Sequence, residues 1–298
     1  MIIKKILACG GIAMVISTAS ACTASPAPTS EPPIGAIPVV RSDSDIVLPI
    51  DAYRLSADKI RAFTVAVDIL GRACMNRFGL YWPPNSPTPG PPAAQNARRY
   101  SITDPDKAKI EGYHHLDAEK RGKDIAARQA KQKQPTSDAV NVWGGTGEQT
   151  FGGQPVPAGG CAGEATRQLD KGAPKADPGI AERLQLDTYQ QMAHDSRVAH
   201  AVGEWRKCMT AAGFDYPDPS AAGADRRWQT AQPSKAEITV ATADAACKTQ
   251  AKVAGTMLAV ETAYQQRAMA KHPTEMAAIK QLLETQFANA TQVAATRG

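Results

Sequence analysis

The sequence predicts a mainly α-helical protein built as two disulfide-stapled helical halves, with long Pro- and Gly-rich loops and little or no sheet. Apolar residues recur every three or four positions over several segments, while alternation between apolar and polar residues is nearly absent. A run at 72–83 is also repeated at 206–217, with a constant offset between matching residues. These two observations indicate helices and an internal duplication.

Each copy of the repeated run is typical of a helix end. Both read Arg-x-Cys-Met-x-x-x-Gly, followed by an apolar residue, a variable residue, an aromatic residue and a proline. Gly79 and Gly213 stand where a left-handed glycine ends a helix, and Pro83 and Pro217 prevent the helix from resuming. Coincidence over a few residues is the alternative, but the shared register favours a duplicated unit.

The N-terminus, residues 1–21, reads as a lipoprotein signal peptide. Lys4 and Lys5 precede an apolar stretch that is too short to span a bilayer, and small residues follow it. The segment Ala19-Ser20-Ala21-Cys22 resembles a bacterial lipobox, although alanine stands where leucine is commonest. Cys22 is therefore the expected lipidation site. An ordinary signal-peptidase cut before Cys22, which would give a soluble secreted protein, is the alternative.

Cysteine parity favours lipidation. Six cysteines are present, and Cys9 would leave with the signal peptide. If the four cysteines of the folded region pair, Cys22 remains as a free and reactive thiol unless it is modified. Two acyl chains, such as palmitate, would anchor it stably. The expected location is the outer, extracytoplasmic face of the cell membrane, in the cell envelope.

The four remaining cysteines are expected to form disulfides, and no Cys-x-x-Cys motif supports a redox or zinc site. Outside the cytoplasm they allow three pairings. The duplicated layout favours one bridge in each half, Cys74 to Cys161 and Cys208 to Cys247.

After the signal peptide, three regions are expected: a flexible Pro/Ser/Thr-rich tether at 22–44, an N-terminal helical half at 45–175 and a C-terminal helical half at 176–298. The apolar run Ile46–Ile50 is expected to cross the fold as an extended strap.

Within the N-terminal half, the first helix begins near Ser56 and a short helix follows Asp104-Pro105. Segment 117–133 is highly charged and leans basic, which indicates a solvated helix or a mobile insert. A glycine-rich loop is expected at 143–153, ahead of a helix from Cys161 to Leu169.

Within the C-terminal half, Asp177-Pro178 opens a helix or helix pair that runs to Gly213. The capping box Ser234–Glu237 predicts one long helix to about residue 271. The last helix is expected at 274–289.

Few residues point to chemistry. The net charge of +5 falls to +3 without Lys4 and Lys5, too mild a value to indicate nucleic acid, so no nucleic-acid partner is expected. His114 and His115 are adjacent and would chelate a metal poorly; no metal and no cofactor is expected. The glycine-rich loop lacks the ending of a P-loop.

The expected ligand pocket comprises Trp143, Phe151, Tyr113 and His114, although a loop of this kind is more often a flexible connection. Glu204 and Glu261 lie on helical runs, but nothing in the sequence brings them together. No catalytic residues are assigned.

Several runs taken together carry a resemblance: Cys22, the two Cys-Met-x-x-x-Gly runs, Tyr113-His114, and the segments 157–165, 243–248 and 260–265. With them the chain resembles a group of uncharacterised secreted lipoproteins of actinobacteria. The resemblance implies a protein anchored on the outer face of the membrane. It transfers no catalytic residue.

The leading hypothesis is therefore a non-enzymatic, membrane-anchored envelope protein with a binding or structural role. Its partner would be an envelope protein, a peptide or a glycan. The alternative is a cell-envelope hydrolase that uses carboxylate or histidine residues near the glycine-rich loop.

Overall fold

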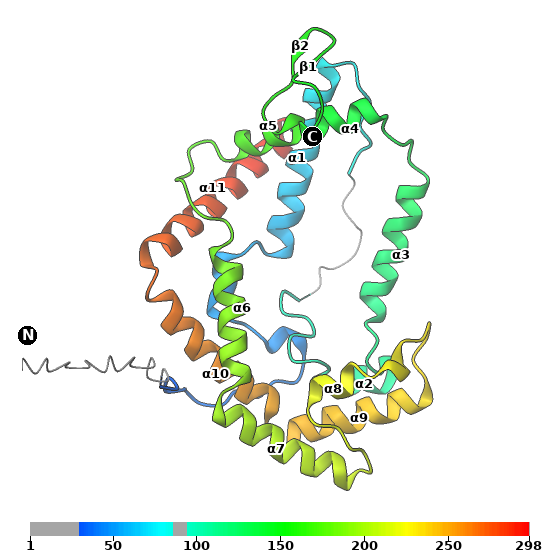
Figure 1. The fold of residues 1–298 in the computed structure, drawn as a ribbon, viewed down its shortest axis with the longest axis vertical. Helices are drawn as coiled ribbons and strands as arrows, with labels where there is room; N and C mark the ends of the chain where they lie inside the picture. Colours follow the sequence, from blue (N-terminus) through cyan, green and yellow to red (C-terminus); the bar gives the residue numbers. More distant parts are fainter. Residues whose placement is uncertain (1–29, 86–93, 298) are drawn as a thin grey trace, which may run out of the picture. The chain divides into compact units, whose positions relative to one another are not determined.

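Helices dominate the residues that the computed structural model describes, 30–85 and 94–297 (Figure 1). Residues 32–298 form one unit, and the fold described below is that unit. The expected signal peptide and Cys22 lie outside the described residues. None of the described helices is long and apolar enough to cross a bilayer.

The mainly helical fold class is confirmed. The described residues contain one two-stranded antiparallel hairpin, β1 (Thr150–Phe151) with β2 (Gln154–Pro155), and two disulfides. Three short 3-10 turns also occur: η1 (Asp43–Asp45), η2 (Pro49–Tyr53) and η3 (Arg226–Trp228). The α-helices are α1 (Ala57–Arg77), α2 (Pro105–Glu111), α3 (Leu116–Ala130), α4 (Ser137–Gly144), α5 (Gly160–Leu169), α6 (Ile180–Ala193), α7 (Ser196–Ala211), α8 (Pro219–Gly223), α9 (Lys235–Gln250), α10 (Val253–Met269) and α11 (Pro273–Arg297).

The two repeated runs form the same helix end. Gly79 and Gly213 both have positive φ, 66° and 88°. The Leu80 N–H donates to the Met75 carbonyl over 3.1 Å, and the Phe214 N–H donates to the Met209 carbonyl over 2.9 Å. This bond from the residue after the glycine satisfies a carbonyl that would otherwise be unpaired.

Helices from both expected halves pack on one another. Helix α1 packs against α11 and α5, α10 against α6 and α7, and α2 against α9. The largest core cluster combines α6, α7, α10 and α11 with the strap, whose Ile46, Leu48 and Ile50 are buried. The Ile50 N–H donates to Oε1 of Gln265 over 3.1 Å, so the strap is also hydrogen-bonded to α10.

Residues just before the strap also pack on the helices. Val40 is buried, and the Pro32 carbonyl accepts a bond from Nη1 of Arg197 over 2.8 Å. A Cβ atom built on Gly255 would lie 2.1 Å from the Pro38 carbonyl oxygen. The backbone of residues 32–40 therefore lies directly against α7 and α10.

The single long helix expected from Ser234 to about residue 271 is wrong. The chain breaks between α9 and α10 at Lys252, whose φ is 54°. The break lets α9 pack against α2 while α10 turns to pack against α6. Neither glycine nor proline marks this point, so tertiary packing overrides local preference here.

Two further boundaries differ from expectation. Trp143 lies in the last turn of α4 rather than in a loop, because Thr136 caps that helix and Gly145 ends it in the left-handed conformation. The last helix, α11, continues to Arg297. Helix α3 does form over the charged segment, and it buries none of its residues, as a solvated helix should.

Candidate ligand-binding site beside the first disulfide

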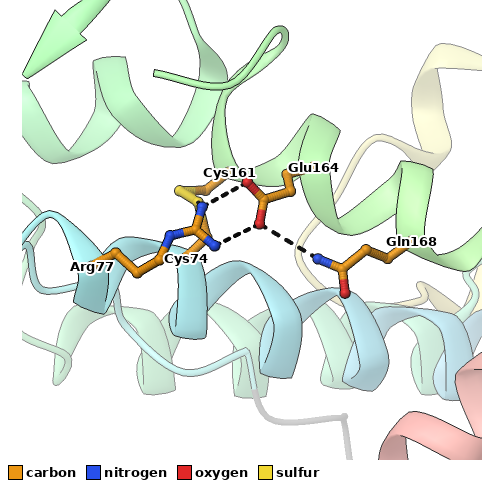
Figure 2. The surroundings of a disulfide bond; sticks show 5 residues. All are labelled: Cys74, Arg77, Cys161, Glu164 and Gln168. Carbon is orange, nitrogen blue, oxygen red and sulfur yellow. Dashed lines mark hydrogen bonds and ion pairs between the residues drawn. A yellow bond between two sulfur atoms is a disulfide. The ribbon is translucent and has the colours of Figure 1, made fainter. Parts of the chain in front are cut away.

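The first disulfide joins the end of α1 to the start of α5 (Figure 2). Cys74 and Cys161 are both buried, with Cα atoms 5.5 Å apart. One turn further along each helix, Arg77 Nη1 and Nη2 donate to the two carboxylate oxygens of Glu164, over 2.8 and 2.6 Å. This hydrogen bonding holds the pKa of Glu164 below its usual range. A covalent bond and a bidentate ion pair thus fix the two helices together.

Glycines bring α4 against the start of α5. Gly145 and Gly160 have φ of 66° and 67°. A Cβ atom on Gly145 would lie 2.3 Å from the Gly160 nitrogen, and one on Gly160 would lie 2.3 Å from the Trp143 carbonyl oxygen. Both positions require glycine for conformation and for space. The glycine-rich pattern therefore places Trp143 at a fixed point beside the disulfide.

A third glycine receives the Trp143 side chain. A Cβ atom built on Gly71, in the middle of α1, would lie 2.5 Å from two atoms of the Trp143 ring. The indole therefore sits in a notch on α1. Trp82 then stacks on Trp143, with ring centroids 4.3 Å apart and an angle of 5° between the planes. Trp82 and Trp143 are called the tryptophan pair below.

The tryptophan pair borders a hollow of about 720 Å³ between α1, the residues after Gly79 and α3, called here the tryptophan hollow. Phe63 and Val67 of α1 and Ile125 of α3 supply its apolar lining. Asn85, Gln129 and Lys131 supply polar groups at its edge. Its size and mixed lining match those of small-ligand sites.

The charges around the tryptophan hollow differ on its two sides. The Asp68 carboxylate accepts a bond from Nε of Arg72 over 2.9 Å and from the Asn85 N–H over 3.0 Å, so its charge is compensated. Across the hollow, segment 117–133 carries six basic and three acidic residues. Gln132 closes one side by donating from Nε2 to the Pro84 carbonyl over 3.0 Å.

The four residues expected to line one pocket are not brought together. Trp143 lines the tryptophan hollow, whereas Phe151 lies on the hairpin and meets Phe78 edge to face, with centroids 6.4 Å apart. Tyr113 and His114 line a separate pocket of about 280 Å³. The sequence could not show this, because Tyr113 and His114 follow α2, which packs on α9.

Both ring nitrogens of His114 are hydrogen-bonded within the protein. Nδ1 lies 2.8 Å from Oε1 of Glu237, and Nε2 lies 2.8 Å from the Thr230 carbonyl oxygen. Both neighbours are acceptors, so both ring nitrogens carry protons when these bonds form together. The Thr230 carbonyl and the Glu237 carboxylate raise the pKa of His114. In this state neither nitrogen offers a lone pair to a substrate or a metal.

A buried polar cluster that sequence reasoning missed lies on α9. Asp244 accepts bonds from Nε1 of Trp205 over 2.8 Å, from the Tyr113 hydroxyl over 3.1 Å and from Lys248 Nζ over 2.8 Å. Lys248 also donates to the Ile102 carbonyl over 3.0 Å. Burial raises the pKa of Asp244 and lowers that of Lys248, and the ion pair opposes both shifts. These satisfied bonds fix α2 and α7 to α9.

The two glutamates noted in the sequence have different surroundings. Glu261 is fully buried and is bound by Arg99, by the Tyr100 hydroxyl over 2.8 Å and by Nε2 of Gln265 over 2.9 Å. Glu204 is exposed and pairs with Lys207 over 2.7 Å. Within the described residues, no group of three or more His, Cys, Asp or Glu side chains is placed to hold a metal ion.

Comparisons with known proteins do not assign this chain to a family. No protein-family model, no curated protein and no solved structure matches the chain. The resemblance to actinobacterial lipoproteins therefore stays a prediction made from sequence motifs.

Proposed function

We propose that this protein is a lipid-anchored binding protein on the outer face of the cell membrane. The observation that carries the proposal is the disulfide pairing. Cys74 pairs with Cys161, and Cys208 pairs with Cys247. Bridges of this kind persist in oxidising compartments outside the cytoplasm. They leave none of these four cysteines to pair with Cys22, which supports lipidation of that thiol.

The tryptophan hollow supports a binding role rather than hydrolysis. A hydrolase needs a carboxylate or imidazole positioned to move a proton. Asp68, the carboxylate that lines the hollow, already accepts bonds from Arg72 and from the Asn85 N–H. His114, the other group considered, lines a different pocket. The other side chains that line the hollow are apolar, aromatic, amide, hydroxyl or basic, and this set suits binding of a ligand.

The anchor is tested with Cys22→Ala, using Cys9→Ala within the signal peptide as the matched control. Intact cells would be labelled with a palmitate analogue and then fractionated. The wild type and Cys9→Ala should carry label and remain in the membrane fraction. Cys22→Ala should lose the label and either enter the medium or retain its signal peptide. A Cys22→Ala protein that stays in the membrane and is correctly processed would show that the lipoprotein proposal is wrong.

A further inference from the structure

We propose that the tryptophan hollow binds a saccharide that carries an acidic group. This inference rests on the proposed function, because it names the class of ligand for the same site. Three features of the hollow support it: a stacked aromatic wall, amide side chains in the lining and a basic segment along one side.

The aromatic wall suits a sugar ring. Trp82 is partly buried and borders the hollow, with one face of its ring covered by Trp143. The face of an indole is electron-rich, and the C–H groups on one face of a pyranose ring carry partial positive charge, so the two surfaces attract each other. The notch at Gly71 and the neighbouring disulfide hold this wall rigid, which lowers the entropic cost of binding.

The polar edge suits hydroxyl groups. A sugar hydroxyl both donates and accepts a hydrogen bond, and a side-chain amide offers a matching donor and acceptor. Asn85 and Gln129 contribute amides at the edge of the hollow. Gln132 donates from Nε2 to the Pro84 carbonyl, an arrangement that leaves its amide oxygen as a further acceptor.

The charge around the hollow selects an acidic sugar over a neutral one. Lys131 lies at the edge, is exposed, and makes no ion pair among the described residues. It belongs to the segment with six basic and three acidic residues, while Asp68 on the opposite side is already compensated by Arg72. A carboxylate or a phosphate on the ligand would meet this uncompensated positive charge.

The experiment uses the full chain purified in detergent and measures affinity by calorimetry, with tryptophan fluorescence as a second readout. The probes are an oligosaccharide of glucose, the same oligosaccharide carrying one phosphate, an oligosaccharide of glucuronic acid, and hexaglutamate. Either acidic saccharide should bind at least about tenfold more tightly than the neutral one. The advantage should shrink between about 0.05 M and about 0.5 M salt, since salt screens exposed charges. Comparison of the phosphate and carboxylate probes identifies the acidic group.

Matched variants separate the two contributions. Trp82→Ala should weaken all saccharides about tenfold, whereas Tyr81→Ala, an exposed aromatic next to it, should not. Lys131→Gln should weaken only the acidic saccharides, by about threefold, and Lys123→Gln, in the same basic segment but outside the hollow, should leave them unchanged. Lys131 is exposed, so its replacement leaves folding intact even if Trp82→Ala does not.

Three results would overturn the inference: no saccharide binds, the neutral saccharide binds as well as the acidic ones, or hexaglutamate binds more tightly than any saccharide. The last result would assign the hollow to an acidic peptide. Each of these would leave the anchoring test untouched, because Cys22→Ala is scored by fractionation and labelling rather than by ligand affinity.

Discussion

The helix ends at Gly79 and Gly213 have three features in common. Each has the same type of backbone hydrogen bond and a fully buried methionine. Each also has a disulfide-bonded cysteine, with Cα atoms 5.5 and 5.6 Å apart in the two bridges. They differ three residues past the glycine. There Trp82 stacks on Trp143 and borders the tryptophan hollow. At the equivalent point Tyr216 is buried, and its hydroxyl donates to Asp225 over 2.9 Å.

A hollow also follows the second cap, but an Asp225–Arg227 ion pair lines it. Arg227 also lies over the ring of Trp228. The repeated run is therefore associated with the same covalent and hydrogen-bonded frame in both places, while the aromatic residue after the cap has different surroundings in the two places.

The largest expected effect comes from removing each bridge in turn. The double variants Cys74→Ala/Cys161→Ala and Cys208→Ala/Cys247→Ala release closures of 87 and 39 residues. Loop entropy predicts losses in the free energy of unfolding of about 5 and about 4 kcal/mol. The first bridge should cost more for a second reason too: both its cysteines are buried, whereas Cys208 is only partly buried.

Denaturant unfolding of both double variants would measure the two losses. Peptide mapping without reduction should recover one linked peptide from each pair. A greater loss for the second bridge would show that local surroundings outweigh closure length in this protein.

The next largest effect on stability comes from replacing one glycine by alanine in each of the two capped helices, α1 and α7. Gly71→Ala forces a methyl group against the Trp143 ring, and overpacking of this kind typically costs about 1–3 kcal/mol. Gly203→Ala on α7 meets nothing within 4 Å, so the better helix propensity of alanine should stabilise the protein by about 0.5–1 kcal/mol. The same substitution should therefore shift the unfolding midpoint in opposite directions. Two stabilising results would mean that Trp143 does not occupy the notch.

The parts of this fold that sequence reasoning could predict are local. Proline at the start of α2, the capping box at Ser234 and the glycines after the two repeated runs each act within a few residues. The pairing of Cys74 with Cys161 and of Cys208 with Cys247 is the one expected from the layout, since each bridge closes within one half.

The parts that could not be predicted depend on contacts between distant segments. Lys252 turns the chain where α9 packs on α2 and α10 packs on α6, while both helices contact α7. Gly71 matters only through Trp143, which lies far along the chain. Likewise, Asp244 and Lys248 read as surface residues of a helix, and only their contacts with Trp205 and Ile102 show that they are buried. The one available signal for Gly71 was a glycine within a strongly periodic helix.

A smaller effect tests whether the two caps are equivalent. Gly79→Ala and Gly213→Ala each place a Cβ atom on a left-handed residue in open space, so conformation alone sets the cost. Each should lose about 1 kcal/mol of unfolding free energy. Thermal or denaturant unfolding measures the losses. Unequal losses, beyond the error of the measurement, would show that the two ends are not held by the same backbone bonds.

The smallest expected effect is a pH dependence of the free energy of unfolding, which should differ between the regions beside the two bridges. Beside the first bridge, Arg77 pairs with Glu164, and the pairing raises the pKa of Arg77 and lowers that of Glu164, so neither titrates near neutrality. Beside the second, Glu237 on the helix that carries Cys247 pairs with His114, whose pKa is raised above 6.5. The folded state therefore holds the imidazole proton more tightly than the unfolded chain does.

Stability from protonated His114 is fully present below pH 6.5 and is lost as the pH rises through the raised pKa. The stability gap between wild type and His114→Gln should therefore narrow as the pH rises above 6.5. The gap for Arg77→Gln should stay constant. His115→Gln is the control, because His115 makes no side-chain bond to the helix that it caps. Denaturant unfolding at several pH values measures all three gaps. A gap for His114→Gln that does not change with pH would mean that the imidazole is not held between Glu237 and the Thr230 carbonyl as an imidazolium.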